Sequence, residues 1–218
     1  MPARIVVDWD GTITETDGLH LVLLEFGDQG IYDDAEARLG HDLTLQEVIA
    51  HEFETVRTPL EAVVSWVREN VKLRAGFSEF AREHKPLVVS SGFRELIEPV
   101  LERDGIEVDV VANELDPRPE GWRVLFRDTI PCPVCGEPCK RSAVAGLDGF
   151  VYVGDGVSDH CVALAASRVF ARDGLAGYLA AKGVLFERFA DFYDIERGLN
   201  GAAGAAVVPP TRSRGRKT

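Results

Sequence analysis

A short apolar run near the start of the chain ends abruptly in acidic residues. The segment Ile5 to Val7 is β-branched and apolar, a composition typical of a buried strand in a parallel sheet. Asp8 and Asp10 follow directly, separated by one residue, and Gly11 and Thr12 come next. Ligands of an open α/β sheet bind at the carboxyl ends of its strands. Two carboxylates there suit chemistry, because one can act as nucleophile or metal ligand and the other as general acid and base.

Length and composition restrict the class of protein. A chain of 218 residues is long enough for one α/β domain with a small insertion. Its 45% hydrophobic residues and mean hydropathy of −0.03 are typical of a globular protein. No run approaches the ~20 apolar residues of a membrane span, and no basic-then-apolar leader is seen. We therefore expect a cytoplasmic protein whose four cysteines are reduced.

Charge is distributed unevenly along the chain. The formal net charge is −12, and the last eight residues hold four basic residues and no acid. Because these four contribute +4, the rest of the chain carries −16. An acidic body repels nucleic acid and anionic membranes, so we expect neither as a partner. Residues 201–218 are rich in Ala and Gly and then basic, and we predict that they form a flexible tail.

Residues 14–75 have the pattern of helices alone. Apolar residues recur with the 3.6-residue period of a helix in 45–56 and again in 60–71, and an earlier helix is predicted over 19–26. A capping box precedes each of the two longer helices, Thr44 to Glu47 and Thr58 to Glu61. No strand-like run interrupts this stretch. The sequence therefore predicts an all-α cap at 14–75, inserted after the first strand.

Strands and helices alternate through the remaining chain. Apolar, β-branched runs predict strands over 87–89, 108–112, 150–153 and 168–171, and helices are predicted over 77–84 and 93–103. Residues 113–128 contain turn signals and predict a hairpin at the rim. This βαβ alternation is typical of a doubly wound parallel sheet in the α/β class. The predicted core comprises residues 1–13 and 76–200.

Further polar residues follow the predicted strands. Ser90, Ser91 and Gly92 come after the second strand, and Asp155 and Asp159 come after the fourth. Lys140 begins a short predicted helix between them. The carboxyl ends of parallel strands meet at one edge of the sheet, so we expect these side chains to gather around Asp8.

An aspartate pair, a Ser-Gly group, a lysine and a Gly-Asp group with a later Asp, in this order, resemble the four motifs of the haloacid dehalogenase-like (HAD) phosphohydrolases. The resemblance extends from Arg4 to about Leu199. The all-α insertion resembles the cap of the phosphoserine-phosphatase-like subgroup, subfamily IB. The cysteine-rich loop before Lys140 and the segments 169–175 and 189–195 resemble the MtnX-like branch of that subgroup.

The resemblance implies a Rossmann-like core and a Mg²⁺-dependent phosphatase. Asp8 would attack phosphorus to give an aspartyl-phosphate, and Asp10 would act as general acid and then general base. The implied magnesium site uses the oxygens of Asp8, Asp10 and Asp155. Asp159 would bind a metal-bound water or orient Lys140.

The same resemblance implies how the phosphate is held. Ser90 and Lys140 would contact or neutralise the phosphoryl oxygens. The implied phosphate-binding set also includes Gly11, Thr12, Ser91 and Gly92. Trp9, between the two aspartates, is predicted to point away from the site.

Two groups of residues allow more than one interpretation. Asp17 is either the N-cap of the helix beginning near Leu19 or a substrate contact. Cys132, Cys135 and Cys139 have the spacing of half a zinc knuckle, but reduced cysteines without a metal are the favoured interpretation. His160 and Cys161 are the candidates for a fourth zinc ligand.

We expect an enzyme that hydrolyses a small phosphate ester, as a monomer or homodimer. The resemblance favours 2-hydroxy-3-keto-5-methylthiopentenyl-1-phosphate of methionine salvage, and phosphoserine and phosphoethanolamine or phosphocholine are alternatives. Dehalogenation is disfavoured because Asp10 is present, and a halide needs no general acid. A zinc-binding interaction module without activity is the non-enzymatic alternative.

Overall fold

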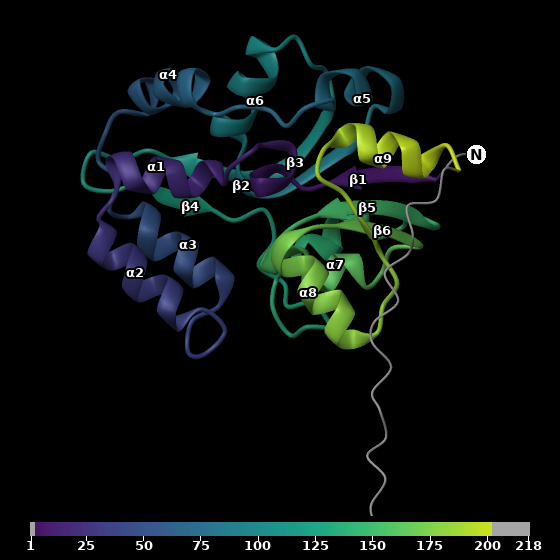
Figure 1. The fold of residues 1–218 in the computed structure, drawn as a ribbon. Coiled ribbons are helices and arrows are strands. Elements are labelled where there is room, and N and C mark those ends of the chain that lie inside the picture. The colour runs from purple at the N-terminus through teal and green to yellow at the C-terminus, as the bar shows by residue number, and fades with distance from the viewer. Residues whose placement is uncertain (1–2, 202–218) are drawn as a thin grey trace, which may run out of the picture.

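The protein is built on one seven-stranded sheet, which the computed structural model describes together with its helices for residues 3–201 (Figure 1). The strand order is β4-β3-β2-β1-β5-β6-β7. The four central strands are β1 (Arg4–Val7), β2 (Leu87–Phe93), β5 (Phe150–Gly154) and β3 (Asp109–Asp116). Strands β6 (Arg168–Ala171), β7 (Glu187–Arg188) and β4 (Arg123–Leu125) complete the sheet. Every pairing is parallel except that of β4 with β3. The predicted doubly wound α/β fold is confirmed.

Strand β1 lies at the point where the order of the strands reverses. The chain builds β2 and β3 on one side of β1 and then β5 and β6 on the other. Val7 pairs with Val88 of β2 and with Val153 of β5. The residues that follow these three positions therefore emerge side by side at the carboxyl edge of the sheet, where α/β proteins bind ligands.

Alternating side chains of β1 enter two separate apolar cores. Ile5 and Val7 belong to the core that packs under α5 (Phe77–His84), α6 (Arg94–Arg103) and α9 (Phe192–Leu199). Val6 belongs to the core on the opposite face, with α7 (His160–Ala163) and α8 (Asp173–Lys182). Because both faces are covered, β1 is apolar throughout its buried length. Figure 1 shows α5, α6 and α9 above the sheet and α7 and α8 below it.

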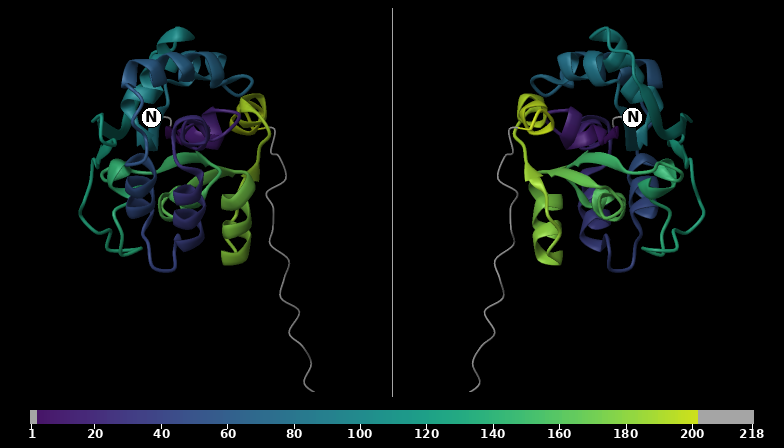
Figure 2. Two further views of the ribbon diagram at one scale, coloured as in Figure 1. Left: turned by 90° about the vertical axis from the view of Figure 1, so that its left-hand side faces the viewer. Right: turned by 90° about the vertical axis from the view of Figure 1, so that its right-hand side faces the viewer.

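The insertion after β1 contains four helices, α1 (Gly18–Phe26), α2 (Gln29–Arg38), α3 (Leu45–Phe53) and α4 (Leu60–Asn70). Helix α4 packs on α6, and its buried Val63 and Val67 join the core above the sheet. Helices α2 and α3 pack on each other instead. Figure 2 shows them beside the teal and green segment that follows β4. The insertion thus contributes both to the main core and to a separate wall beyond the sheet edge.

Most predicted elements are present, and several details differ. The capping box of Thr44 and Glu47 is confirmed. The box predicted at Thr58 is wrong, because Pro59 occupies the N-cap position of α4 and no side chain caps that helix. Helix α2 was not resolved as a separate element by periodicity, since it is polar on most of its surface. The predicted hairpin is confirmed as β3 paired with the short β4.

Predictions for Lys140, Trp9 and the tail can be compared with the described residues. The predicted helix at Lys140 is a 3₁₀ turn over Lys140–Val144. Trp9 is buried in the core above the sheet, as predicted. The predicted flexible tail lies outside the described residues, apart from Gly201. Among residues 3–201, no helix combines the length and apolarity needed to cross a membrane.

Helix α9 approaches the sheet through a glycine. A Cβ added to Gly198 would lie 2.6 Å from Cε1 of Phe170, whose ring is buried in the core. We expect Gly198→Ala to lower the unfolding free energy by about 1–3 kcal/mol through overpacking. Denaturant unfolding would measure the change.

Gly177→Ala in α8 is the matched control, because nothing lies within 4 Å of an added Cβ there. This substitution should stabilise the protein by roughly 0.5–1 kcal/mol through helix propensity. Equal effects of the two substitutions would contradict the close packing assigned to Gly198.

Candidate active site

The site begins with a wide turn that follows β1. Residues Trp9–Ile13 form this turn, which is closed by a hydrogen bond from the Thr14 N–H to the Trp9 carbonyl (3.0 Å). Gly11 has φ +70°, and a Cβ there would lie 2.4 Å from Oδ2 of Asp155. Glycine is therefore required at this position both by the backbone conformation and by the approach of the second acidic group.

Arg74 holds this turn from the far end of the insertion. Its guanidinium donates hydrogen bonds to the carbonyls of Gly11 (2.7 Å), Thr12 (2.8 Å) and Thr14 (2.9 Å). Three carbonyls held by one planar group fix the turn that carries Asp10. Arg74 was not predicted from the sequence, because a single arginine after a helical segment carries no motif signal.

A buried lysine joins two of the predicted aspartates. The Lys140 Nζ contacts Oδ1 of Asp8 and lies 2.7 Å from Oδ1 of Asp159. All three side chains are at least 95% buried. Burial alone would lower the pKa of Lys140, but the two carboxylates outweigh burial and hold it above its usual range. Lys140 is thus a fixed positive charge beside Asp8.

Asp159 uses its full hydrogen-bonding capacity within the protein. Its Oδ1 accepts from Lys140 and from the Tyr152 hydroxyl (2.6 Å), and its Oδ2 accepts from the backbone N–H groups of Asp155 (2.8 Å) and Gly156 (3.0 Å). A carboxylate offers about four lone-pair sites. The two roles predicted for Asp159 are to bind a metal-bound water or to orient Lys140. This geometry favours the second role. Tyr152 was missed because a tyrosine within a strand normally signals only packing.

Asp8 and Asp155 lie together and leave negative charge uncompensated. Asp8, Asp155 and Asp159 each place one carboxylate oxygen in a cluster, and these three oxygens lie within 4.8 Å of one another. Burial, followed by the charge of Asp159, raises the pKa of Asp8, and Lys140 opposes this rise. Burial and Asp159 also raise the pKa of Asp155 to about 6. Crowded carboxylates with raised pKa values fit a hard divalent cation, which would supply the missing positive charge.

Thr12 supports Asp155. The buried Thr12 hydroxyl donates to Oδ1 of Asp155 (2.7 Å), so the side chain of this predicted phosphate-binding residue is already engaged. The Gly11 N–H, also predicted to bind phosphate, donates to Oγ1 of Thr14 (3.0 Å). In this structure the two residues therefore stabilise the turn and the metal-facing carboxylate.

The Asp10 carboxyl contacts the base of the insertion and the second strand. Its Oδ1 accepts from the Gly18 N–H (3.0 Å), and its Oδ2 lies 3.5 Å from the Ser90 hydroxyl. Burial, followed by the charge of Asp17, raises the pKa of Asp10 to about 8. A carboxyl with that pKa is largely protonated at neutral pH and can donate a proton.

The second strand brings its hydroxyl groups to the same place. Ser90 is 2% exposed, and its Oγ accepts from the Gly92 N–H (2.8 Å). Ser91 lines both neighbouring cavities. The side chain of Asn113 donates to the Ser91 carbonyl (2.7 Å) and accepts from the Arg127 N–H (3.0 Å). Asn113 therefore connects this strand end to the segment after β4.

Two adjoining cavities open over these residues. One, of about 220 Å³, is lined by Asp8, Asp10 and Asp155 and by residues of α1, α2 and α3. The other, of about 370 Å³, is lined by Ser90, Lys140 and the cysteine-rich loop. Both are lined by Ser91, Val157 and Ser158, by three residues of α2 and α3, and by Leu39 between these helices. A molecule with one end at Asp8 can thus extend along the wall formed by the insertion.

The remaining predicted residues lie at the edge of these cavities. Asp17 caps α1 through a hydrogen bond from the His20 N–H (2.9 Å), and it also lines the smaller cavity. Cys132, Cys135 and Cys139 gather with Cys161 beside Lys140. The structure therefore brings every predicted site residue to one edge of the sheet.

The turn, the buried lysine and the paired carboxylates occur in a chain whose residues 5–164 match the family model of haloacid dehalogenase-like hydrolases. The match covers more than half of the sequence, so the protein belongs to this hydrolase family.

Individual proteins that are similar to this chain have names consistent with this family. A 2-hydroxy-3-keto-5-methylthiopentenyl-1-phosphate phosphatase of Exiguobacterium sp. is 27% identical and matches over 92% of this chain and 99% of its own length. The protein of the same name in Bacillus cereus is 26% identical, over 91% and 96%. A substrate-bound phosphoserine phosphatase has a TM-score of 0.67 at 17% identity, covering 90% of this chain and 98% of that one. Its likeness supports the fold.

Glu52 of α3 is a buried acid in the smaller cavity. It is 5% exposed, and its Oε1 has no hydrogen-bond partner among the described residues. Burial, followed by the charge of Glu36, raises the pKa of Glu52 to about 8. Glu52 is therefore predominantly uncharged in the folded protein at neutral pH, although it ionises near pH 4.3 in an unfolded chain.

We expect Glu52→Gln to stabilise the protein increasingly as the pH rises. Between the unfolded and folded pKa values the wild-type unfolded state releases a proton that the folded state keeps, so stability falls with pH. The advantage of the variant should grow by about 1 kcal/mol per pH unit between pH 5 and 8. Denaturant unfolding at several pH values would measure it, with the exposed Glu69→Gln as control. A constant difference across this range would refute the assignment.

Proposed function

We propose that the protein is a phosphomonoester hydrolase that acts on a small phosphorylated metabolite through an aspartyl-phosphate. One observation carries the proposal: Asp8 lies at the carboxyl end of the central strand, between the buried Lys140 and the carboxylate of Asp155, and faces a cavity. A phosphate dianion repels an anionic nucleophile, so positive charge must be fixed next to that nucleophile.

Magnesium is the cofactor that the acidic cluster fits best. Asp8 and Asp155 would hold the ion through carboxylate oxygens, and the backbone carbonyl of Asp10 would complete the protein ligands. The ion would supply positive charge to the phosphoryl oxygens. Thr12 keeps Asp155 in position through its hydroxyl. Asp159 is assigned to Lys140 and not to the metal.

The two aspartates of the first motif have different roles in the reaction. Asp8 attacks phosphorus, and the ester oxygen leaves with a proton from Asp10, whose raised pKa keeps that proton available. Asp10 then accepts a proton from the water that hydrolyses the aspartyl-phosphate. Gly18 holds the Asp10 carboxyl in place through its N–H.

Lys140 and the second strand bind the phosphoryl group. The ammonium of Lys140 favours the ionised form of Asp8 and would offset charge on the transferring oxygens. The hydroxyls of Ser90 and Ser91 lie at the adjoining strand end, where they can donate to the same oxygens. Gly92 holds the Ser90 side chain through its N–H.

The substrate we favour is 2-hydroxy-3-keto-5-methylthiopentenyl-1-phosphate, in the cytoplasm. Relatives covering nearly the whole chain carry that name. The larger cavity also has an apolar wall suited to a methylthio chain, made by Leu39, Leu43, Leu45, Ile49 and Phe126. Helices α1 to α3 would act as the cap that encloses this substrate.

Phosphoethanolamine or phosphocholine is the second candidate. Asp17 and Glu36 line the smaller cavity, and carboxylates there favour a substrate with a positive charge. Phosphate release from a panel of esters, with Mg²⁺ and with EDTA, separates the candidates. The panel contains these two esters, phosphoserine, the methylthiopentenyl phosphate and an aryl phosphate. We expect metal-dependent release with the methylthiopentenyl ester hydrolysed fastest, and preference for a cationic ester would favour the second candidate.

Asp8→Asn should abolish turnover of every ester, because an amide is not a nucleophile toward phosphorus. Phosphate release at saturating substrate would measure the loss. The control is Asp148→Asn, which changes the same functional group at an exposed position that lines neither cavity. Wild-type rates in Asp8→Asn would overturn the assigned nucleophile.

Asp10→Asn should slow the release of a poor leaving group far more than that of a good one. A general acid contributes about 10²–10⁴-fold to an alkyl ester, whose alkoxide needs a proton, and little to an aryl ester. Release of the alcohol or phenol in the first turnover isolates this step from hydrolysis of the aspartyl-phosphate. Equal losses for both esters would contradict the role of Asp10 as general acid.

A further inference from the structure

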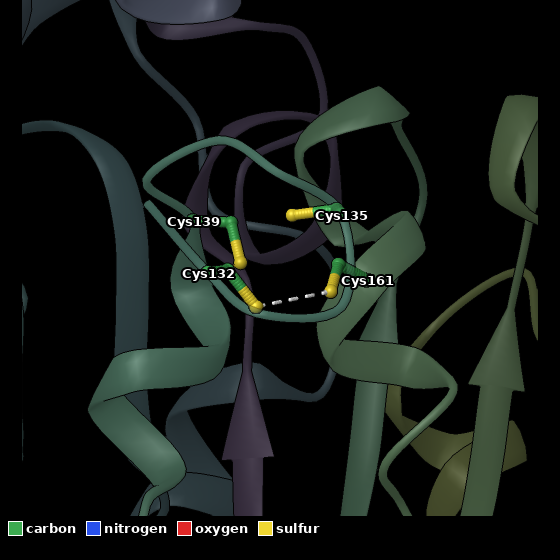
Figure 3. A group of neighbouring side chains, drawn as sticks. All are labelled: Cys132, Cys135, Cys139 and Cys161. Atoms are coloured by element: carbon green, nitrogen blue, oxygen red, sulfur yellow. Dashed lines mark hydrogen bonds between the residues drawn. The ribbon is translucent and has the colours of Figure 1, made fainter. Parts of the chain in front are cut away.

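All four cysteines of the chain gather in one cluster, although they come from two separate segments. Cys132, Cys135 and Cys139 lie in the loop that precedes Lys140, and Cys161 lies in α7. The structure shows all four as free cysteines. Figure 3 shows the sulfur atoms turned toward one another across the space between the loop and the helix. The phosphatase mechanism uses none of these thiols.

The spacing of the sulfur atoms suits a tetrahedral metal ion. All four lie within 4.8 Å of one another, and those of Cys132 and Cys161 are 3.9 Å apart. Zinc binds thiolate sulfur at about 2.3 Å in a tetrahedron, which requires sulfur atoms about 3.8 Å apart. The cluster is therefore only slightly wider than a closed zinc site, while two sulfurs in a disulfide would be about 2 Å apart.

The backbone of the loop is folded in the form that presents two cysteines to one ion. The Gly136 N–H donates to the Cys132 carbonyl (2.8 Å), and the Cys132 N–H donates to the Glu137 carbonyl (3.0 Å). Gly136 takes φ +84°, which glycine adopts without strain. The loop thereby places the sulfur atoms of Cys132 and Cys135 within 4.8 Å of each other.

The surroundings of the cluster fit its charge as a metal site. Four thiolates around one Zn²⁺ carry a net charge of −2. The Arg141 guanidinium lies beside the cluster, 3.1 Å from the carbonyl oxygen and 3.9 Å from the sulfur of Cys161. A cation donating at that position stabilises anionic sulfur. Soft thiolate ligands also select zinc over the hard magnesium ion expected at Asp8.

We propose that Cys132, Cys135, Cys139 and Cys161 hold a structural Zn²⁺ that fastens the loop bearing Lys140 to helix α7. Four protein ligands leave no open position, so the ion is structural. Cys139 directly precedes Lys140, and Cys161 lies two residues after Asp159. The ion thus joins the two segments whose side chains form the Lys140–Asp159 ion pair, and the loop it orders forms a wall of the larger cavity.

Metal analysis of the purified full-length protein tests the proposal. We expect one zinc per chain in the wild type and in Val134→Ser, a matched control in the same loop whose side chain is exposed. Cys161→Ser and Cys135→Ser should lose the zinc. Asp155→Asn should retain it, which distinguishes this site from the magnesium site. Protein that is free of zinc when prepared with zinc present, or that contains a disulfide by mass spectrometry, would overturn the proposal.

Cobalt provides a readout on the wild type alone, in case the cysteine variants do not fold. Co²⁺ in place of zinc should give the visible absorption of a tetrahedral tetrathiolate site, and Asp155→Asn should give the same spectrum. A spectrum of octahedral oxygen ligation would overturn the proposal. Neither measurement depends on phosphatase activity, so failure of the proposed function and failure of the zinc site are distinguished. The link to Lys140 rests on the proposed function, and it predicts a lower kcat in Cys161→Ser and an unchanged kcat in Val134→Ser.

Discussion

The buried contact of Lys140 with Asp8 and Asp159 is the interaction on which the rest of the site depends. Three charged groups this deeply buried are stable only when each is compensated, and removal of one partner from such a group typically costs about 3–5 kcal/mol. The fold supplies that compensation from three separate strands and loops. Asp159 is held by Tyr152 and two backbone N–H groups, so Lys140 is aimed at Asp8 from a rigid support. The net negative charge that remains at Asp8 and Asp155 defines where a cation fits.

The central part of this arrangement was predictable from the sequence. Parallel pairing of β1 with β2 and β5 places Asp8, Ser90 and Asp155 at one edge, and the apolar runs before these residues indicate that outcome. Three of the four motifs lie directly at strand ends, where short-range patterns are strongest. Lys140 was predictable only through the family resemblance, because a lysine at the start of a short turn carries no signal of burial.

Other parts of the site were not predictable, for physical reasons. The side chains of Arg74 and Asn113 donate hydrogen bonds to backbone carbonyls, and the hydroxyl of Tyr152 donates to the Asp159 carboxylate. Such partners depend on tertiary geometry. The hydroxyl of Thr12 is engaged by Asp155, 143 positions away. The motif pattern gave no indication of this contact. The proximity of Cys161 to the cysteine-rich loop depends on the packing of α7 beside that loop, which the sequence does not show. The N-cap of α4 is Pro59 and not the predicted Thr58, because local propensity alone does not determine where a helix begins.

The hydrogen bonds between the two ends of the insertion have a consequence for how such proteins diversify. The Glu15 N–H donates to the Lys72 carbonyl (3.0 Å) and the Arg74 N–H to the Ile13 carbonyl (2.7 Å), so the chain leaves and rejoins the core through one narrow neck. Beyond this neck, helices α2 and α3 can be lengthened, shortened or exchanged while the register of β1 with β2 stays intact, whereas α4 is held by the main core. The scaffold thereby allows the cavity walls to change while the turn that carries Asp10 keeps its place.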